Sequence, residues 1–194
     1  PALTYIGDTA FVGPNNDAFT IDIECVSRTF HFGTDVFDGE FNPFDGTQTN
    51  LSTVSPCVLE SHTELLAMIN DCLADDPVLG NCTDGPYGPI DGWNTSAVTD
   101  FTLAFSNRAS FNGDLSLWDM SNALNLISMF RNAASFNSDI GGWDTGTATM
   151  MDEMFQDASN FDRDISKWDT SNVISMASMF GGASNFNGDI SKWD

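Results

Sequence analysis

Apolar side chains recur along the second half of the chain at fixed intervals of 25 residues. Five columns of like residues keep this spacing. They are Trp93, Trp118, Trp143, Trp168 and Trp193; Phe105, Phe130, Phe155 and Phe180; Phe111, Phe136, Phe161 and Phe186; Asp114, Asp139, Asp164 and Asp189; and Leu115, Ile140, Ile165 and Ile190. A unit this short cannot bury its own apolar face, so the pattern predicts stacked coils whose Phe and Trp columns form the core.

Within one copy, the apolar spacing predicts two short elements. Residues 164–169 place Ile165 and Trp168 three apart, which we interpret as a short strand bending at a corner. Residues 175–183 carry apolar residues at helical spacing and contain two glycines, a pattern typical of one or two helical turns. The expected fold is therefore an α/β repeat solenoid, leucine-rich-repeat-like, with one short strand and one short helix per 25-residue coil. Four complete copies and the start of a fifth occupy residues 93–194.

The residues before the repeats follow two other patterns. Residues 19–25 alternate between apolar and polar side chains, as a half-buried strand does, and residues 1–56 are expected to form a small β-rich N-terminal region. In residues 60–74 the apolar side chains share one face of a helix. This helix would lie in a disulfide-stapled segment, residues 57–92, and would cap the first coil as stacked repeats require.

All the cysteines precede the repeats, and no two of them have the Cys-x-x-Cys spacing of a zinc or redox site. Two disulfides are expected from Cys25, Cys57, Cys72 and Cys82. Of the three possible connectivities we favour Cys72 with Cys82, the most local pair, and Cys25 with Cys57. Disulfides form in oxidising compartments, so the protein is expected to be extracellular or at the cell surface.

Secretion makes N-linked glycans possible partners. Three Asn-x-Ser/Thr sequences are candidate acceptor sites, at Asn50, Asn81 and Asn94. Their number is close to what composition alone predicts, so glycosylation depends on the cysteine argument for secretion. Asn94 is the favoured site, because it occupies a column that is expected to face water and is otherwise held by Asp119, Asp144, Asp169 and Asp194.

The chain is strongly acidic, with 6 Lys and Arg against 28 Asp and Glu and a formal net charge of -22. A polyanion repels phosphate, so no nucleic acid or anionic lipid surface is expected as a partner. No apolar run has the length of a membrane span, so no membrane insertion is expected. A solvated acidic surface is the plain interpretation of the charge.

Calcium is the sharper alternative for two polar columns. One is the Asp column that begins at Asp114; the other contains Asn112, Asn137, Asp162 and Asn187, which we expect to form an inward ladder in a tight turn. Such turns need no metal, so no metal and no cofactor is expected. No acid, base and nucleophile converge, and the two histidines, His31 and His62, lie in unrelated settings. The sequence therefore predicts no catalytic residue and no enzyme.

Residues 168–194 read W-D-T-S-N-V-I-S-M-A-S-M-F-G-G-A-S-N-F-N-G-D-I-S-K-W-D. This string resembles the repeat of BspA-like surface proteins, a relative of the leucine-rich repeat. Residues 86–101 are similar to the first repeat of that family, and the resemblance covers roughly residues 60–194. It implies an extracellular solenoid used for adhesion or assembly, with no catalytic residues.

The last coil repeats the apolar columns of the inner coils, with Phe186, Ile190 and Trp193 unchanged in type. Natural solenoids close such a face with a polar cap. The last coil shows no such cap, so we expect another copy of the chain to cover this apolar face. The contact would use an apolar segment at the start of that copy, which contains Leu3, Tyr5 and Ile6.

This reasoning gives the leading functional hypothesis, a secreted structural glycoprotein subunit that assembles head-to-tail into an extracellular filament, a homopolymer of the chain. The alternative is a monomeric cell-surface adhesin or a glycan- or protein-binding module. A longer chain or an intramolecular cap would also cover the face.

Overall fold

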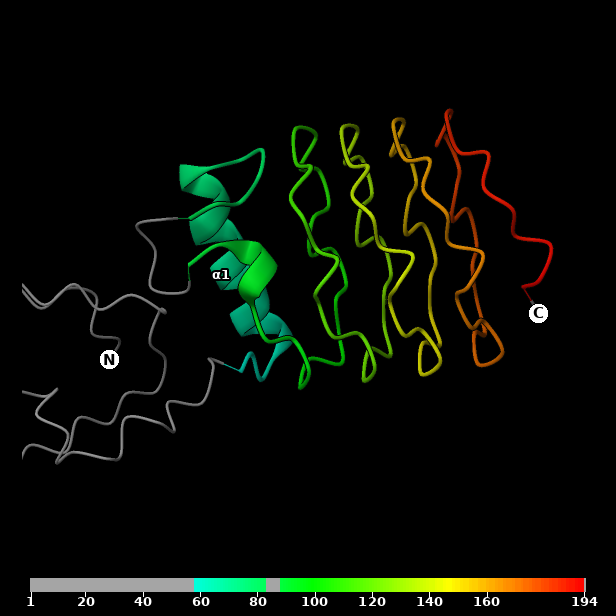
Figure 1. Ribbon diagram of the computed structural model, residues 1–194, viewed down its shortest axis with the longest axis horizontal. Helices are drawn as coiled ribbons and strands as arrows, with labels where there is room; N and C mark the ends of the chain where they lie inside the picture. Colours follow the sequence, from blue (N-terminus) through cyan, green and yellow to red (C-terminus); the bar gives the residue numbers. More distant parts are fainter. Residues whose placement is uncertain (1–57, 83–87, 194) are drawn as a thin grey trace, which may run out of the picture.

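The computed structural model describes residues 58–82 and 88–193. Figure 1 shows helix α1 at one end of a row of similar coils, with the last coil at the opposite end. The β-rich region expected over residues 1–56, with Asn50, Cys25 and Cys57, lies outside the described residues.

Helix α1, His62–Asp75, matches the amphipathic helix expected over residues 60–74. Two side-chain hydrogen bonds cap the N-terminus of the helix. The Ser61 hydroxyl accepts the Glu64 amide at 3.2 Å, and the Glu64 carboxylate accepts the Glu60 amide at 3.0 Å. Its buried residues are Leu65, Met68, Ile69, Cys72 and Leu73. They join the same apolar core as the coils, so α1 covers the end of the coil stack.

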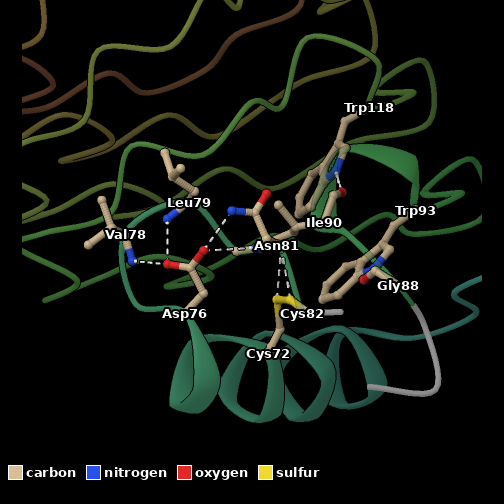
Figure 2. Close-up of a disulfide and its surroundings, with 11 residues drawn as sticks. Cys72, Asp76, Val78, Leu79, Asn81, Cys82, Gly88, Ile90, Trp93 and Trp118 are labelled. Carbon is tan, nitrogen blue, oxygen red and sulfur yellow. Dashed lines mark hydrogen bonds between the residues drawn. A yellow bond between two sulfur atoms is a disulfide. The ribbon is translucent and has the colours of Figure 1, made fainter. Parts of the chain in front are cut away.

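The loop after α1 is held by a carboxylate and a disulfide (Figure 2). The Asp76 side chain accepts the amides of Val78, Leu79 and Asn81, which lowers the pKa of this carboxyl, the Leu79 amide being the main cause. Cys72 and Cys82 form the favoured local disulfide. A short 3-10 helix, η2, Ile90–Gly92, then leads into the first tryptophan.

Successive coils meet through isolated parallel bridges at the same position of each copy. The bridges join Asp100 to Asn125, Asn125 to Met150, and Met150 to Ser175. They fall seven residues after each tryptophan. The strand expected at residues 164–169 was therefore placed wrongly: there the Trp168 amide donates to the Ile165 carbonyl at 3.1 Å, closing a turn.

The helical turns expected at residues 175–183 are also wrong, because this segment consists of consecutive tight turns. In each copy two residues of this segment have a positive φ, among them Ser128 (53°), Asn132 (59°) and Ser178 (55°). An apolar residue at every third or fourth position faces the core from such turns as it would from a helix, so periodicity alone did not separate the two. The assignment to leucine-rich-repeat-like solenoids stays a prediction.

The aromatic columns form the centre of the stack. Ring centroids of Phe105, Phe130 and Phe155 follow one another at 5.5 Å, and Trp143 and Trp168 stack at 6.1 Å. These distances exceed the ~4.8 Å between adjacent strands, because nearly parallel rings pack with a lateral offset. The inner rings are buried, so the columns contribute apolar surface that one coil hides against the next.

Candidate functional site: the stacking faces of the coils

Backbone amides on one coil donate to carbonyls on the next at four alternate residues. Between the first two copies the bonds run from Phe101 to Asn125 (2.8 Å), Leu103 to Ile127 (3.0 Å), Phe105 to Met129 (2.8 Å) and Asn107 to Arg131 (2.7 Å). The same positions donate at the next two interfaces, from Leu126, Ser128, Phe130 and Asn132, and from Met151, Glu153, Phe155 and Asp157. Each coil thus presents a row of N–H groups toward its successor.

This one-way pattern differs from an ordinary parallel sheet, in which every strand both donates and accepts across each gap. Here local turns use the remaining groups. The Met129 amide donates to the Leu126 carbonyl at 3.3 Å, and the Arg131 amide donates to the Ser128 carbonyl at 3.1 Å. Over residues 101–107 and their repeats, therefore, backbone N–H groups donate to the next coil and backbone C=O groups accept from the previous coil.

Tryptophan side chains fasten each coil to the one before it. The indole nitrogen of Trp143 donates to the Leu115 carbonyl at 2.9 Å, and Trp193 repeats the contact with Ile165 at 3.3 Å. Trp118 makes the equivalent bond to Ile90, in η2, at 2.8 Å (Figure 2). The Trp column is therefore both an apolar stack and a row of hydrogen-bond donors.

The Asn column forms a ladder, but on the surface rather than inside. The Asn112 side-chain oxygen accepts the Asn137 amide at 2.7 Å, Asn137 accepts the Asp162 amide at 3.0 Å, and Asp162 accepts the Asn187 amide at 3.0 Å. These residues are exposed or half-buried, which corrects the expected inward direction. Only an acceptor oxygen is needed, so Asp162 serves as well as asparagine.

The acidic columns form tight turns with the residues that follow them. The Asp119 carboxylate accepts the Ser121 hydroxyl at 2.6 Å and the Ser121 amide at 3.0 Å, and these bonds hold the pKa of Asp119 below its ordinary value. Asp169 and Ser171 repeat the arrangement. Within residues 58–82 and 88–193, no group of three or more His, Cys, Asp or Glu side chains could hold a metal ion, so the geometry adds nothing in favour of calcium.

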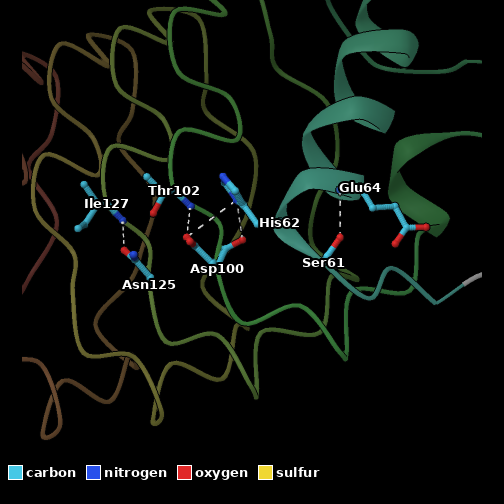
Figure 3. A network of polar contacts seen from close by, with 7 residues as sticks. All are labelled: Ser61, His62, Glu64, Asp100, Thr102, Asn125 and Ile127. Atoms are coloured by element: carbon cyan, nitrogen blue, oxygen red, sulfur yellow. Dashed lines mark hydrogen bonds and ion pairs between the residues drawn. The ribbon is translucent and has the colours of Figure 1, made fainter.

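The acceptor side of the first coil is covered by α1 and the residues before it (Figure 3). The ring nitrogen Nδ1 of His62 lies 3.0 Å from the Asp100 carbonyl, the position at which Asn125 accepts an amide in the next coil. The Asp100 carboxylate accepts the Thr102 amide at 2.9 Å and lies 3.9 Å from His62. The Leu59 amide donates to the Asn94 carbonyl at 3.0 Å. These groups take the place of a preceding coil.

The donor side of the last coil is open, and we call it the last-coil face. Its four forward amides have no acceptor among the described residues; they belong to Met176, Ser178, Phe180 and Gly182. Beside them lies a shallow depression lined by Met176, Met179, Phe180, Ile190 and Trp193. Ile165 is 0% exposed whereas its counterpart Ile190 is 40% exposed. The last-coil face therefore combines unpaired donors with an apolar floor.

The sequence-predicted interface residues divide into three groups. Ile190 and Trp193 line the last-coil face. Phe186 does not line the depression and is half-buried, stacked on Phe161 at 5.8 Å and on Phe180 at 4.0 Å. Leu3, Tyr5 and Ile6 lie outside the described residues.

Sequence reasoning missed Met176, Met179 and Phe180, which it assigned to the interior side of a helix. Their position in the repeat could have identified them. A side chain that packs against the next coil in the inner copies is exposed in a copy that no described coil follows.

Two of the candidate glycan acceptors are described. The Asn94 side-chain oxygen accepts the Ser96 amide at 3.1 Å and the Ser96 hydroxyl at 2.7 Å, and the residue is half-buried. Asn81 is exposed, but its amide nitrogen donates to Asp76 at 2.9 Å, and it adjoins the disulfide at Cys82. Its nitrogen, the atom that a glycan would modify, is therefore already engaged.

These features define a repeat protein of stacked 25-residue coils, with a donor side, an acceptor side and a helical cap. The family described as "Mycoplasma protein of unknown function, DUF285" matches residues 78–194, and the chain belongs to this family. No curated protein and no solved structure matches the chain. Among the described residues, no helix has the length and apolar character needed to cross a membrane.

Proposed function

We propose that the protein is a secreted structural subunit of the BspA-like repeat type, which assembles head-to-tail through its stacking faces. The observation that carries the proposal is the last-coil face, with its four unpaired amides beside an apolar depression. Unpaired donors at an edge favour the addition of another chain segment, and burial of the apolar floor adds to the gain. A following coil of the same polypeptide would cover the face in the same way.

The chemistry of the face restricts its partner. Two last-coil faces match each other poorly, because each presents a row of four N–H groups, whereas carbonyls face the next coil only at isolated flanking positions, as Thr149 and Ser159 do toward Ile174 and Asn185. The partner must offer backbone carbonyls at alternate residues, together with apolar side chains. Contact between unlike faces repeats from one molecule to the next, which leads to a filament unless the rotation closes a ring.

In a second copy, the first coil is already covered by α1. A different segment of that copy is therefore needed. Residues 1–12, with Leu3, Tyr5 and Ile6, are the proposed segment, because this stretch is rich in apolar residues and a segment that pairs as a strand offers alternate carbonyls and side chains together. These residues lie outside the described part of the chain.

Charge and disulfide chemistry agree with an extracellular assembly. A net charge of -22 disfavours lateral clumping of filaments, while short-range apolar burial still joins the ends. The Cys72 and Cys82 pair supports an oxidising location. N-linked glycans would add to the solubility of the filament surface.

A monomeric adhesin, or a glycan- or protein-binding module, is the second candidate. It is favoured by exposed aliphatic side chains beside the bridge column, where Ile174 is 81% exposed and Leu124 is 47% exposed. Ile174 belongs to the last coil but does not line the last-coil face. The two candidates thus use different surfaces of one coil.

A matched pair of substitutions tests the proposal. We expect the unaltered 194-residue chain to grow in mass with concentration in light scattering, Ile190→Asp to remove this growth, and Ile174→Asp to retain it. Circular dichroism and thermal melting establish that both variants are folded. Equal association of both variants, or loss of association with Ile174→Asp alone, would contradict assembly through the last-coil face. A chain that stays monomeric at all concentrations would contradict the filament proposal and leave the second candidate.

A further inference from the structure

The sequence Phe-Asn-Gly-Asp occurs twice in the repeats, at residues 111–114 and 186–189. Both copies occupy the same positions of the coil, and their asparagines, Asn112 and Asn187, belong to the surface ladder. Identical neighbours give the two sites the same intrinsic reactivity. Any difference between them in the folded protein must come from structure.

We propose that Asn187 is a site of spontaneous deamidation, whereas the structure protects Asn112. In this reaction the amide nitrogen of the following glycine attacks the side-chain carbonyl carbon of asparagine. A carbon–nitrogen bond forms, ammonia leaves, and a cyclic succinimide remains. Water then opens the ring at either carbonyl, which gives aspartate or isoaspartate.

Asn112 is held in a position that opposes ring closure. Its side-chain oxygen accepts the Asn137 amide at 2.7 Å, and its own amide donates to the Val78 carbonyl at 2.7 Å. Gly113 is buried, and a Cβ atom there would lie only 2.5 Å from the Leu79 carbonyl oxygen. The side chain cannot rotate toward Gly113 without losing the ladder bond, and water has little access to the glycine.

Asn187 lacks this restraint. Its amide donates to Asp162 at 3.0 Å, but its side-chain oxygen accepts no hydrogen bond from the described residues. Asn187 is exposed and Gly188 is half-buried. The nearest backbone atom to a Cβ at Gly188 is the Arg163 oxygen, at 3.4 Å, compared with 2.5 Å at Gly113. The carboxamide of Asn187 can therefore turn toward the Gly188 nitrogen.

The ladder tolerates one product and not the other. Asp162 occupies the same column in the preceding coil, and its carboxylate accepts the next amide as asparagine does. Aspartate at position 187 would therefore preserve the acceptor. Isoaspartate adds a methylene group to the backbone, which would move the following residues out of register with the preceding coil.

Peptide mapping of the intact chain after incubation at mildly alkaline pH tests this inference. One net hydrogen bond contributes about 0.5–1.5 kcal/mol, so we expect Asn187 to deamidate roughly 2- to 10-fold faster than Asn112 in the folded protein. In denaturant the two rates should become equal, because the local sequences match. Gly188→Ala should slow the reaction at position 187 by hindering the attack.

Equal rates in the folded chain, or a faster reaction at Asn112, would overturn the proposal. A difference that persists in denaturant would do the same, because it would trace the effect to sequence rather than to the fold. Self-association is not needed for any of these readings. The deamidation rates can therefore be interpreted whether or not the filament proposal holds.

Discussion

The indole nitrogen of Trp168 donates a hydrogen bond of 3.1 Å to the carbonyl of Ile140, 28 positions earlier in the chain. The same relationship joins Trp143 to Leu115 at 2.9 Å. Each bond crosses from one coil to the one before it and ends on a residue that is fully buried. A single side chain thus fixes both the register and the spacing of two coils.

Replacing Trp143 by phenylalanine tests this role. Phe keeps an aromatic ring in the stack but leaves the buried Leu115 carbonyl without its donor, which costs about 1–3 kcal/mol in addition to the lost ring contacts. We expect the free energy of unfolding, measured in urea, to fall by at least that amount. Trp193→Phe is the matched control, since the side chain is only half-buried and water can replace its bond. Equal losses in both variants would contradict this account.

The Asp turns predict a loss of stability in acid. Serine hydrogen bonds from Ser121 and Ser171 hold the pKa values of Asp119 and Asp169 below the ordinary value of 3.8, so the folded state binds protons less readily than the unfolded state. Their stabilisation is therefore complete above the unfolded pKa of 3.8 and is lost as the pH falls below it toward the folded values. Thermal melting between neutral pH and about pH 2 should show this decline.

Asp119→Asn provides the control for the acid experiment. Asn94 already forms the same turn through an amide oxygen, accepting the Ser96 hydroxyl at 2.7 Å. The variant should keep the turn at neutral pH and lose its share of the acid dependence. A pH profile identical to that of the unaltered protein would show that Asp119 does not contribute to it.

Glycosylation is expected at Asn94 in preference to Asn81. The Asn94 oxygen forms the turn, whereas the Asn81 nitrogen donates to Asp76 and its neighbour Cys82 is cross-linked. Mass spectrometry of glycopeptides from a secreting eukaryotic host would measure the occupancy of each site. Higher occupancy at Asn81 than at Asn94 would contradict the prediction.

Much of the architecture could be predicted from the spacing of a few residues. The Trp and Phe columns require that equivalent side chains meet in successive coils, and the amphipathic pattern of residues 60–74 predicts α1 closely. The local conformation could not be predicted. Leu103, Ser128 and Glu153 share a left-handed conformation although none is glycine, so residue type does not mark the first turn of the segment. The second left-handed position carries Asn, Asp or Gly, which tolerate this conformation, but such residues also end helices.

The candidate site could likewise be predicted only where it depends on repeat spacing and not on local backbone conformation. Ile190 and Trp193 could be identified by their columns, because side-chain burial follows the repeat. The row of amides at Ser178 and Phe180 depends on backbone direction, which the sequence pattern does not specify. The free N–H groups all point toward the next coil because turns within each coil already hydrogen-bond the alternate N–H groups.

The Phe column offers a test of whether the last-coil face is covered in solution. Phe130 is 0% exposed, stacked between Phe105 and Phe155, and Phe130→Ala should cost about 3–5 kcal/mol because it leaves a cavity. Phe180 belongs to the same column but is half-buried at the last-coil face, so Phe180→Ala should cost clearly less in the dilute monomer. If assembly covers the face, the cost of Phe180→Ala should rise with protein concentration while that of Phe130→Ala stays constant. Urea unfolding of both variants at low and high concentration measures this difference, and a Phe180→Ala cost that does not change with concentration would argue against assembly through this face.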